Sequence, residues 1–312
     1  MTRIPTMTKP AMKQTLRHTT LLIAGSLIIM GQPAEAALKH YWPLDDTVGT
    51  TATSGVAGGN DGTVVGFDET KLNDPAESPP GDWVSDTPAQ PAHSTGSLDF
   101  EGGIGTTYMD GGNIGIRTDE NGGEATVSLW FKPRNMADDN RILVNSGAGG
   151  TVCCGPGLGG HIHTLSNGAI EIWKGDGWQP AADAGTVQDG QWHHLAFVWV
   201  GDQATTYVNG VEQNTVESNF NFDADNGIAT NAPDPELGFG LGRSFNSQFG
   251  ISDAIFDDVA VWDNALVETH IQLLASGTSP LVIPEPHSLV ITSLACLCLT
   301  LARRGGKRSL SP

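Results

Sequence analysis

Paired carboxylates are the first candidates for chemistry in this sequence. Two acids on one face of a strand can act as nucleophile and general acid toward a glycosidic bond. Asp257 and Asp258 are adjacent, and neighbouring residues of a strand point to opposite faces, so we expect them to point apart. The stretch around Glu171 holds a single acid. The sequence also lacks a serine nucleophile elbow and an HExxH motif, so we expect that the protein is not an enzyme.

The adjacent residues His193 and His194 are subject to the same alternation. On a strand the two imidazoles cannot converge on one metal ion or substrate atom. We expect one of them to be packed and the other to lie at the surface.

Tryptophans in loops are the candidates for sugar binding, because an exposed indole can stack on the apolar face of a pyranose. Trp178, in GDGWQP, and Trp83, in PPGDWVSD, lie between the expected strands. For each, the alternative is an indole tucked against the sheet. Other tryptophans lie in expected strands, where burial is the rule, among them Trp130, Trp192, Trp199 and Trp262.

The adjacent cysteines Cys153 and Cys154 could pair in an exported domain, because oxidising compartments favour disulfides. The bond would close a small, strained ring and make the loop rigid. The alternative is a metal site with His161 and His163, although this spacing matches no common zinc pattern.

The N-terminal 36 residues have the order of a secretory signal. Basic residues precede an apolar run at 21–30, and Ala34 and Ala36 fit the small-x-small rule for signal peptidase. We expect cleavage to leave Ala37 as the first residue. A retained membrane anchor is the alternative, but the run is shorter than the ~20 residues of a comfortable span.

The C-terminal segment, 280–312, has an apolar run at 288–302 followed by Arg303 and Arg304. Basic residues stay on the cytoplasmic side, so the run would insert in the membrane with the main domain outside. The run is preceded by the tripeptide Pro284, Glu285 and Pro286. This order resembles the PEP-CTERM sorting signal of Gram-negative bacteria. The resemblance implies recognition and cleavage by an exosortase, and a protein that is anchored in the inner membrane only in transit.

The charge of the chain excludes some partners. The formal net charge is −19, and loss of both ends would leave 8 basic and 33 acidic residues. Such a surface repels nucleic acid and anionic lipid. We therefore expect a soluble exported domain at the outer surface or in the extracellular matrix.

The middle of the chain predicts an all-β domain, 37–279. Segments with a period of two recur between residues rich in glycine, asparagine and aspartate, and Asn167-Gly168 and Asn209-Gly210 predict hairpin turns. One helix is expected at 265–276, and residues 68–90 are expected to form a long loop. Many short strands indicate a two-sheet antiparallel sandwich. The expected strands are 38–44, 62–67, 97–100, 107–114, 125–132, 141–145, 162–165, 169–173, 192–200, 204–208, 237–242 and 255–262.

Several of these segments together resemble the LamG-like jelly-roll domains of the concanavalin A-like lectin/glucanase superfamily. They are SLDFEGGIGTTYMDGGNIGI, ATVSLWFKPRN, DGQWHHLAFVWVGDQATTYVNGVE, LGFGLGRSF and AIFDDVAVWDNALVETHIQLLASG. They occur in the order of the family. The resemblance implies a jelly-roll sandwich with a short C-terminal helix, flanked here by the signal helix and the C-terminal hydrophobic helix.

The resemblance also implies one structural calcium ion, with oxygen ligands after the first strand and in the last. Asp45, Asp46, Asp257 and Asp258 are the matching residues, and hard oxygen ligands suit calcium.

These patterns together predict an exported, non-catalytic protein that binds a polysaccharide or surface glycan. The alternative is a structural or adhesive protein with protein partners, and a third hypothesis is a glycoside hydrolase. Fold alone does not choose between them.

Overall fold

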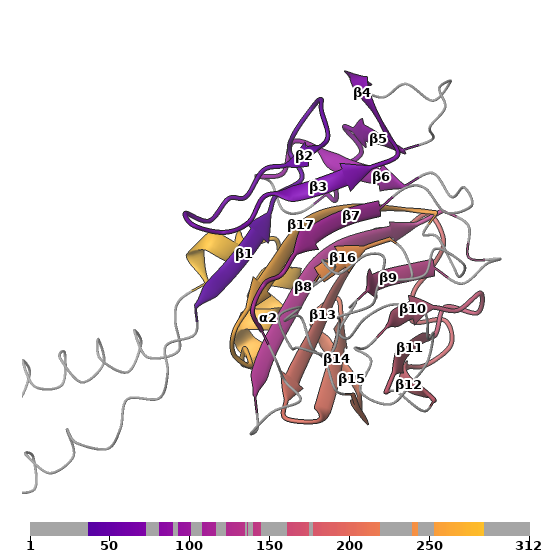
Figure 1. Cartoon of the computed structure of the whole chain (residues 1–312). Coiled ribbons are helices and arrows are strands. Elements are labelled where there is room, and N and C mark those ends of the chain that lie inside the picture. Colours follow the sequence, from indigo (N-terminus) through magenta and orange to yellow (C-terminus); the bar gives the residue numbers. More distant parts are fainter. Residues whose placement is uncertain are drawn as a thin grey trace, which may run out of the picture. The chain divides into compact units, whose positions relative to one another are not determined.

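A computed structural model of the 312-residue chain describes residues 37–72, 81–89, 93–100, 108–116, 123–134, 136, 140–144, 161–174, 177–218, 239–242 and 253–283. Within these residues nine strands form one sheet and eight form a second (Figure 1). The first sheet consists of β1 (Leu38–Trp42), β4 (Phe67–Leu72), β5 (Gly81–Val84), β6 (Ser97–Phe100), β8 (Glu124–Pro133), β13 (His193–Val200), β14 (Gln203–Val208), β15 (Val211–Glu217) and β17 (Ala254–Trp262). The second consists of β2 (Thr51–Ala52), β3 (Gly62–Val65), β7 (Tyr108–Gly112), β9 (Asn140–Val144), β10 (Ile162–Thr164), β11 (Ile170–Trp173), β12 (Trp178–Ala182) and β16 (Phe239–Leu241).

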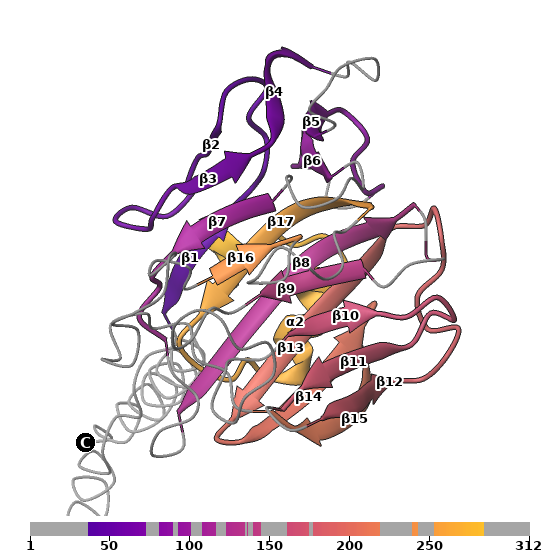
Figure 2. The same cartoon turned by 45° about the vertical axis from the view of Figure 1, so that its right-hand side comes forward.

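The two sheets face each other as a sandwich, which confirms the predicted jelly-roll class (Figure 2). The nine-stranded sheet runs β15-β14-β13-β8-β17-β6-β5-β4, with β1 also paired to β17. The eight-stranded sheet runs β12-β11-β10-β9-β16-β7-β3-β2. The pairs are antiparallel except β4 with β5. At one end the edge strands of the two sheets are linked, because Asn214 Nδ2 in β15 donates to the Pro180 carbonyl in β12 at 3.0 Å.

Side chains alternate between the two faces of the central strands, and those on one face form the core between the sheets. In β13, Leu195, Phe197 and Trp199 point into this core. Ala196 and Val198, on the other face of the strand, belong to a second buried cluster. The strand is therefore apolar on both faces, which explains its continuous hydrophobic run.

A helix covers the outer face of the nine-stranded sheet. This helix, α2 (Glu268–Ala275), buries Ile271 and Leu274 in the second cluster (Figure 1). Gly277 ends it with a φ of 87° and a hydrogen bond from its N–H to the Leu274 carbonyl, as the sequence predicts. A short 3-10 helix, η1 (Pro280–Val282), follows. No helix among the described residues is long and apolar enough to cross a membrane.

Strand β17 exchanges partners along one of its edges. Strand β8 pairs with the other edge along most of its length. On the exchanged edge, residues 254–256 pair with β6, and residues 259–262 pair with β1. The change of partner falls at Asp257 and Asp258, where the pairing with β8 also shifts register.

The expectation of a long loop at 68–90 was wrong in part, because this segment contains most of β4 and all of β5. Acidic residues and prolines obscure the alternation there. Strands β12 and β15 also escaped the sequence prediction, since polar residues dominate β15 and β12 begins inside a glycine-rich stretch. Edge strands such as these carry weak hydrophobic patterns because one side lacks a neighbour.

The hairpin glycine Gly168 provides a test of the packing under β10 and β11. Gly168 and Gly185 share a φ of 82°, but a Cβ on Gly168 would lie 2.3 Å from the Val187 carbonyl oxygen, whereas a Cβ on Gly185 would meet no atom within 4 Å. We expect Gly185→Ala to lower the free energy of unfolding by about 1 kcal/mol. Gly168→Ala should lower it by about 2–4 kcal/mol. Urea denaturation measures both, and equal losses would contradict the close packing.

Candidate functional site

A bulge in β17 places two adjacent carboxylates on the same face. The pairing with β8 shifts between Asp257 and Ala260, and Asp258 adopts a φ of 49°. Phe256 and Val259, which flank the acids, both lie in the core between the sheets. Both acids therefore point to the outer face, because a bulge interrupts strict alternation. The expectation that they point apart was wrong.

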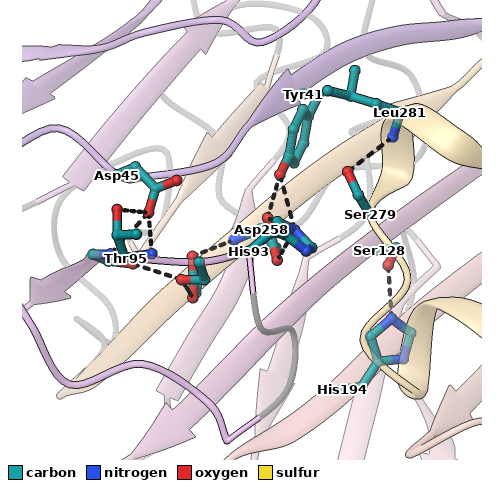
Figure 3. A network of polar contacts seen from close by, with 12 residues as sticks. Tyr41, Asp45, His93, Thr95, Ser128, His194, Asp258, Ser279 and Leu281 are labelled. Carbon is teal, nitrogen blue, oxygen red and sulfur yellow. Dashed lines mark hydrogen bonds and ion pairs between the residues drawn. The ribbon is translucent and has the colours of Figure 1, made fainter.

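The segment before β6 and strand β1 supply the partners of this acid pair (Figure 3). Ser94 Oγ donates to Asp257 Oδ2 at 2.5 Å, and His93 Nε2 lies 3.0 Å from Asp258 Oδ2. The Tyr41 hydroxyl donates to Asp258 Oδ1. The Asp258 N–H donates to Asp257 Oδ1 at 2.8 Å. These five residues, together with Asp45 nearby, are called the acid network below.

Asp45 and Asp46 follow β1 and bond to two different segments of the chain. Asp45 Oδ1 accepts from the N–H groups of Thr95 and Gly96, at 2.6 and 2.8 Å (Figure 3). Asp46 accepts from the N–H and the hydroxyl of Thr53, both at 2.8 Å. Asp45 is thus tied to the segment that holds the acid pair, whereas the described bonds of Asp46 go to Thr53.

Burial dominates the protonation of the acid network. Asp257 and Asp258 are 0% and 3% exposed. Burial, and then repulsion from Asp258, raise the pKa of Asp257 well above its ordinary value. Burial also raises the pKa of Asp258, although the hydrogen bond from Tyr41 and the charge of His93 oppose that rise. Burial and the charge of Asp258 raise the pKa of Tyr41. These shifts favour a proton retained by the pair.

The four aspartates that the sequence singled out for calcium have different hydrogen-bond partners. No group of three or more His, Cys, Asp or Glu side chains in the described part of the chain is placed to hold a metal ion. Oxygens of Asp45, Asp257 and Asp258 accept hydrogen bonds from peptide, hydroxyl and phenol groups. Calcium binding by these aspartates stays a prediction.

The aromatic platform predicted at Trp83 was wrong. Its side chain is fully buried in the core between the sheets, and its Nε1 donates to the Gly49 carbonyl at 2.9 Å. The reason is that Trp83 lies in β5, where pairing with β6 directs the indole inward.

Strands β10, β11 and β12 carry a patch of rings on the face away from the core. Cross-strand pairing sets His163 opposite Glu171 and Trp173 opposite Trp178. The residues between them point inward, so these side chains point outward. The inward residues of β10 and β11 are Ile162, Ile170 and Ile172.

The rings of this patch are held in a fixed arrangement. The Trp178 indole stacks on the His163 imidazole, with ring centroids 3.8 Å apart and planes 12° apart. Trp173 meets Trp178 edge-on at 5.2 Å, and His161 meets it at 6.5 Å. His163 Nε2 lies 3.1 Å from Glu171 Oε2. These five residues are called the Trp178 patch below.

The Trp178 patch has a buried base and a partly exposed top. His161 and His163 are buried, whereas Glu171, Trp173 and Trp178 are partly exposed. Trp178 is the first residue of β12 and so lies in a strand, not in the loop that the sequence predicted. One face of its indole packs on His163, which leaves a rigid, partly exposed ring of the kind that stacks on sugars.

His193 and His194 point to different partners, as the alternation predicts. The Gln188 N–H donates to His193 Nε2 at 3.0 Å, and His194 Nε2 lies 2.9 Å from Ser128 Oγ (Figure 3). Both are buried, so the expectation that one is at the surface was wrong. Burial lowers the pKa of His194 to about 3, which keeps it neutral at physiological pH.

Several residues singled out in the sequence lie outside the described residues. They are Ala34, Ala36, Cys153, Cys154, Pro284, Glu285, Pro286, Arg303 and Arg304. Their roles in cleavage, disulfide formation and sorting stay predictions.

Comparison with known proteins gives a family and a set of distant likenesses. A family model described as the concanavalin A-like lectin/glucanases superfamily matches residues 105–272. No curated protein matches the chain. Domain 4 of AbnA, a GH43 extracellular arabinanase from Geobacillus stearothermophilus solved with arabinotriose, is 18% identical with a TM-score of 0.48, covering 78% of this chain and 100% of that one.

Two further structures are similar over a smaller share of their length. A Trypanosoma rangeli sialidase solved with the inhibitor DANA is 14% identical with a TM-score of 0.46, covering 80% of this chain and 34% of that one. The receptor binding domain of botulinum neurotoxin C/D mosaic serotype is 12% identical with a TM-score of 0.46, covering 77% and 51%. This chain therefore spans about a third of the length of the sialidase.

The raised pKa of Asp257 predicts the sign of a pH effect on stability. When a carboxyl has a higher pKa in the folded state than in the unfolded state, its protonated form stabilises the folded protein. This contribution is fully present below the unfolded pKa of about 4 and is lost as the pH rises through the folded pKa. Asp257→Asn stays neutral, so from pH 4 to pH 8 it should gain about 1 kcal/mol or more in unfolding free energy relative to the parent. Urea denaturation across this range measures the difference.

The control is Asp189→Asn, at an exposed position, which should follow the parent at every pH. Parallel curves for Asp257→Asn and the parent would contradict a protonated acid pair.

Proposed function

Because the chain belongs to the concanavalin A-like lectin/glucanases superfamily, we propose that it is an exported, non-catalytic protein that binds polysaccharide through the Trp178 patch. The observation that carries this proposal is the stacked geometry of Trp178 on His163. A ring that is already fixed loses little conformational entropy when a sugar stacks on it. Trp173, whose ring plane lies 68° from that of Trp178, would form a second wall.

The polar groups of the patch support recognition of hydroxyl groups. Glu171, whose side chain is 25% exposed, lies beside the stacked rings and is oriented by His163. A carboxylate accepts hydrogen bonds from pairs of sugar hydroxyls.

The charge around the patch favours a neutral polysaccharide over a uronic-acid polymer. Glu171 is the acid of the patch, and the nearby Lys174 is paired with Glu217 at 3.1 Å. The chain as a whole has a net charge of −19. Carboxylates on a ligand would be repelled both at the patch and at longer range.

The placement of the acids supports binding without catalysis. Hydrolysis of a glycosidic bond by the usual mechanisms needs two carboxylates on either side of the bond. The Trp178 patch contains one, Glu171. The adjacent pair Asp257 and Asp258 is buried and hydrogen-bonded to Ser94 and Tyr41.

The sequences of the terminal segments support a function outside the cell. We propose that signal peptidase cuts after Ala36 and that an exosortase recognises the tripeptide at 284–286 and removes the hydrophobic tail. Cys153 and Cys154 would then meet oxidising conditions and form a disulfide. Removal of both ends also raises the negative charge of the mature domain, in keeping with a soluble protein among polysaccharides.

Glycan binding tests the patch directly. On an array of neutral and uronic-acid glycans, read with calcium and with chelator, we expect binding to neutral members. For the best ligand, Trp178→Ala should weaken the affinity at least about 10-fold by calorimetry, because a stacking partner is lost. Trp192→Ala, a partly exposed tryptophan bonded to Asp86, should change it by less than about 2-fold.

No glycan signal with or without calcium would overturn the proposal in favour of a protein-binding role. Preferred binding of uronic-acid glycans would overturn the inference about charge alone. Release of reducing sugar from the bound glycan would restore the hydrolase hypothesis.

The mass of the mature protein tests its processing. Intact-mass measurement on protein from the native host should give a chain that starts at Ala37 and ends near Pro284. When Pro284 and Pro286 are both replaced by alanine, the measured mass should include the hydrophobic tail. A wild-type mass that includes residues 285–312 would contradict exosortase cleavage.

A further inference from the structure

The backbone nitrogen of Ala37 lies against a carboxylate at the start of the sandwich. The Ala37 N–H donates to Asp263 Oδ1 at 2.9 Å, and the Asp263 N–H points back to the Ala37 carbonyl at 3.3 Å. Lys39 Nζ lies 2.8 Å from the other oxygen, Asp263 Oδ2. One carboxylate therefore bridges the first described residue and the side chain two residues later.

Cleavage after Ala36 would change the chemistry of this nitrogen. Water adds across the Ala36–Ala37 peptide bond, which leaves a carboxylate on Ala36 and an amine on Ala37. The amine is protonated at neutral pH, since α-amino groups have a pKa of about 8. The nitrogen that donated one hydrogen bond as an amide would then carry a positive charge and three N–H donors.

We propose that Asp263 is the receptor for the mature amino terminus, so that signal-peptide removal converts the Ala37–Asp263 hydrogen bond into an ion pair. This inference rests on cleavage after Ala36 and is independent of glycan binding. The charged partners that the structure places at this point are Asp263, after β17, and Lys39, in β1. A carboxylate between two cations suits both, and Oδ1 already faces the Ala37 nitrogen.

The position of the ion pair gives it a structural role. Among the described strands, β1 pairs only with β17, and the Ala37–Asp263 contact continues that ladder by one residue past Leu38 and Trp262. An ion pair at this position should reduce fraying of β1. The side chains of Lys39 and Asp263 are 43% and 32% exposed, so solvent screens the pair and its effect should be modest.

The pH dependence of the effect has a definite sign. The carboxylate favours the protonated amine, so the amine should hold its proton more tightly in the folded state than in the unfolded state. The added stability is then fully present below pH about 8 and is lost as the pH rises through the folded pKa.

A double-mutant cycle on the mature protein tests the ion pair between the Ala37 amine and Asp263. One variant carries an extra alanine between Ala36 and Ala37, which moves the amine away but keeps its charge, and the other is Asp263→Asn. At pH 7 the extra alanine should lower the melting temperature by about 1–3 °C in the parent and by less than about 0.5 °C in Asp263→Asn. At pH 10 the two losses should be equal.

Selective acylation of the α-amine gives a readout that a merely structural role would not move. At pH 7 the parent should react about 2–5 times more slowly than the variant with the extra alanine, because the carboxylate retains the proton. This comparison does not require Asp263→Asn to fold. Equal acylation rates, an additive cycle, or a mature chain that begins at another residue would each overturn the proposal.

Discussion

The bulge at Asp257 and Asp258 is the constraint on which one half of the sandwich depends. Strand β17 pairs with β6 along its first part and with β1 along its last part, so one edge of the strand must release one neighbour and accept another. The extra residue with positive φ at Asp258 makes this exchange possible. It also turns two carboxylates to one face, where their desolvation must be offset by hydrogen bonds and by a retained proton.

The partners of these carboxylates come from parts of the chain that are distant in sequence. Tyr41 comes from β1, and His93 and Ser94 from the segment before β6. The acid network therefore joins both strands that meet at the exchange. In this structure the aspartates that resemble calcium ligands serve as cross-links between segments.

The sequence predicted the sandwich, the hairpin turns and the closing helix because these depend on local patterns. The Asn167-Gly168 turn fixes the pairing of His163 with Glu171, so this part of the Trp178 patch could have been found by counting outward from the turn. The stacking of Trp178 could not, because the pairing of β11 with β12 shifts register. The convergence of Asp257 and Asp258 also escaped prediction, since a bulge changes direction without a distinct residue pattern.

The hydrogen bond between Asn214 and Pro180 affects how copies of this protein could associate through a sheet edge. An open sheet edge offers unpaired peptide groups to a neighbour and can start aggregation. Here the edge strands β12 and β15 are joined by a hydrogen bond from Asn214 Nδ2 to the Pro180 carbonyl, and proline itself has no N–H to offer. The Trp178 patch is thus presented beside an edge that resists strand addition.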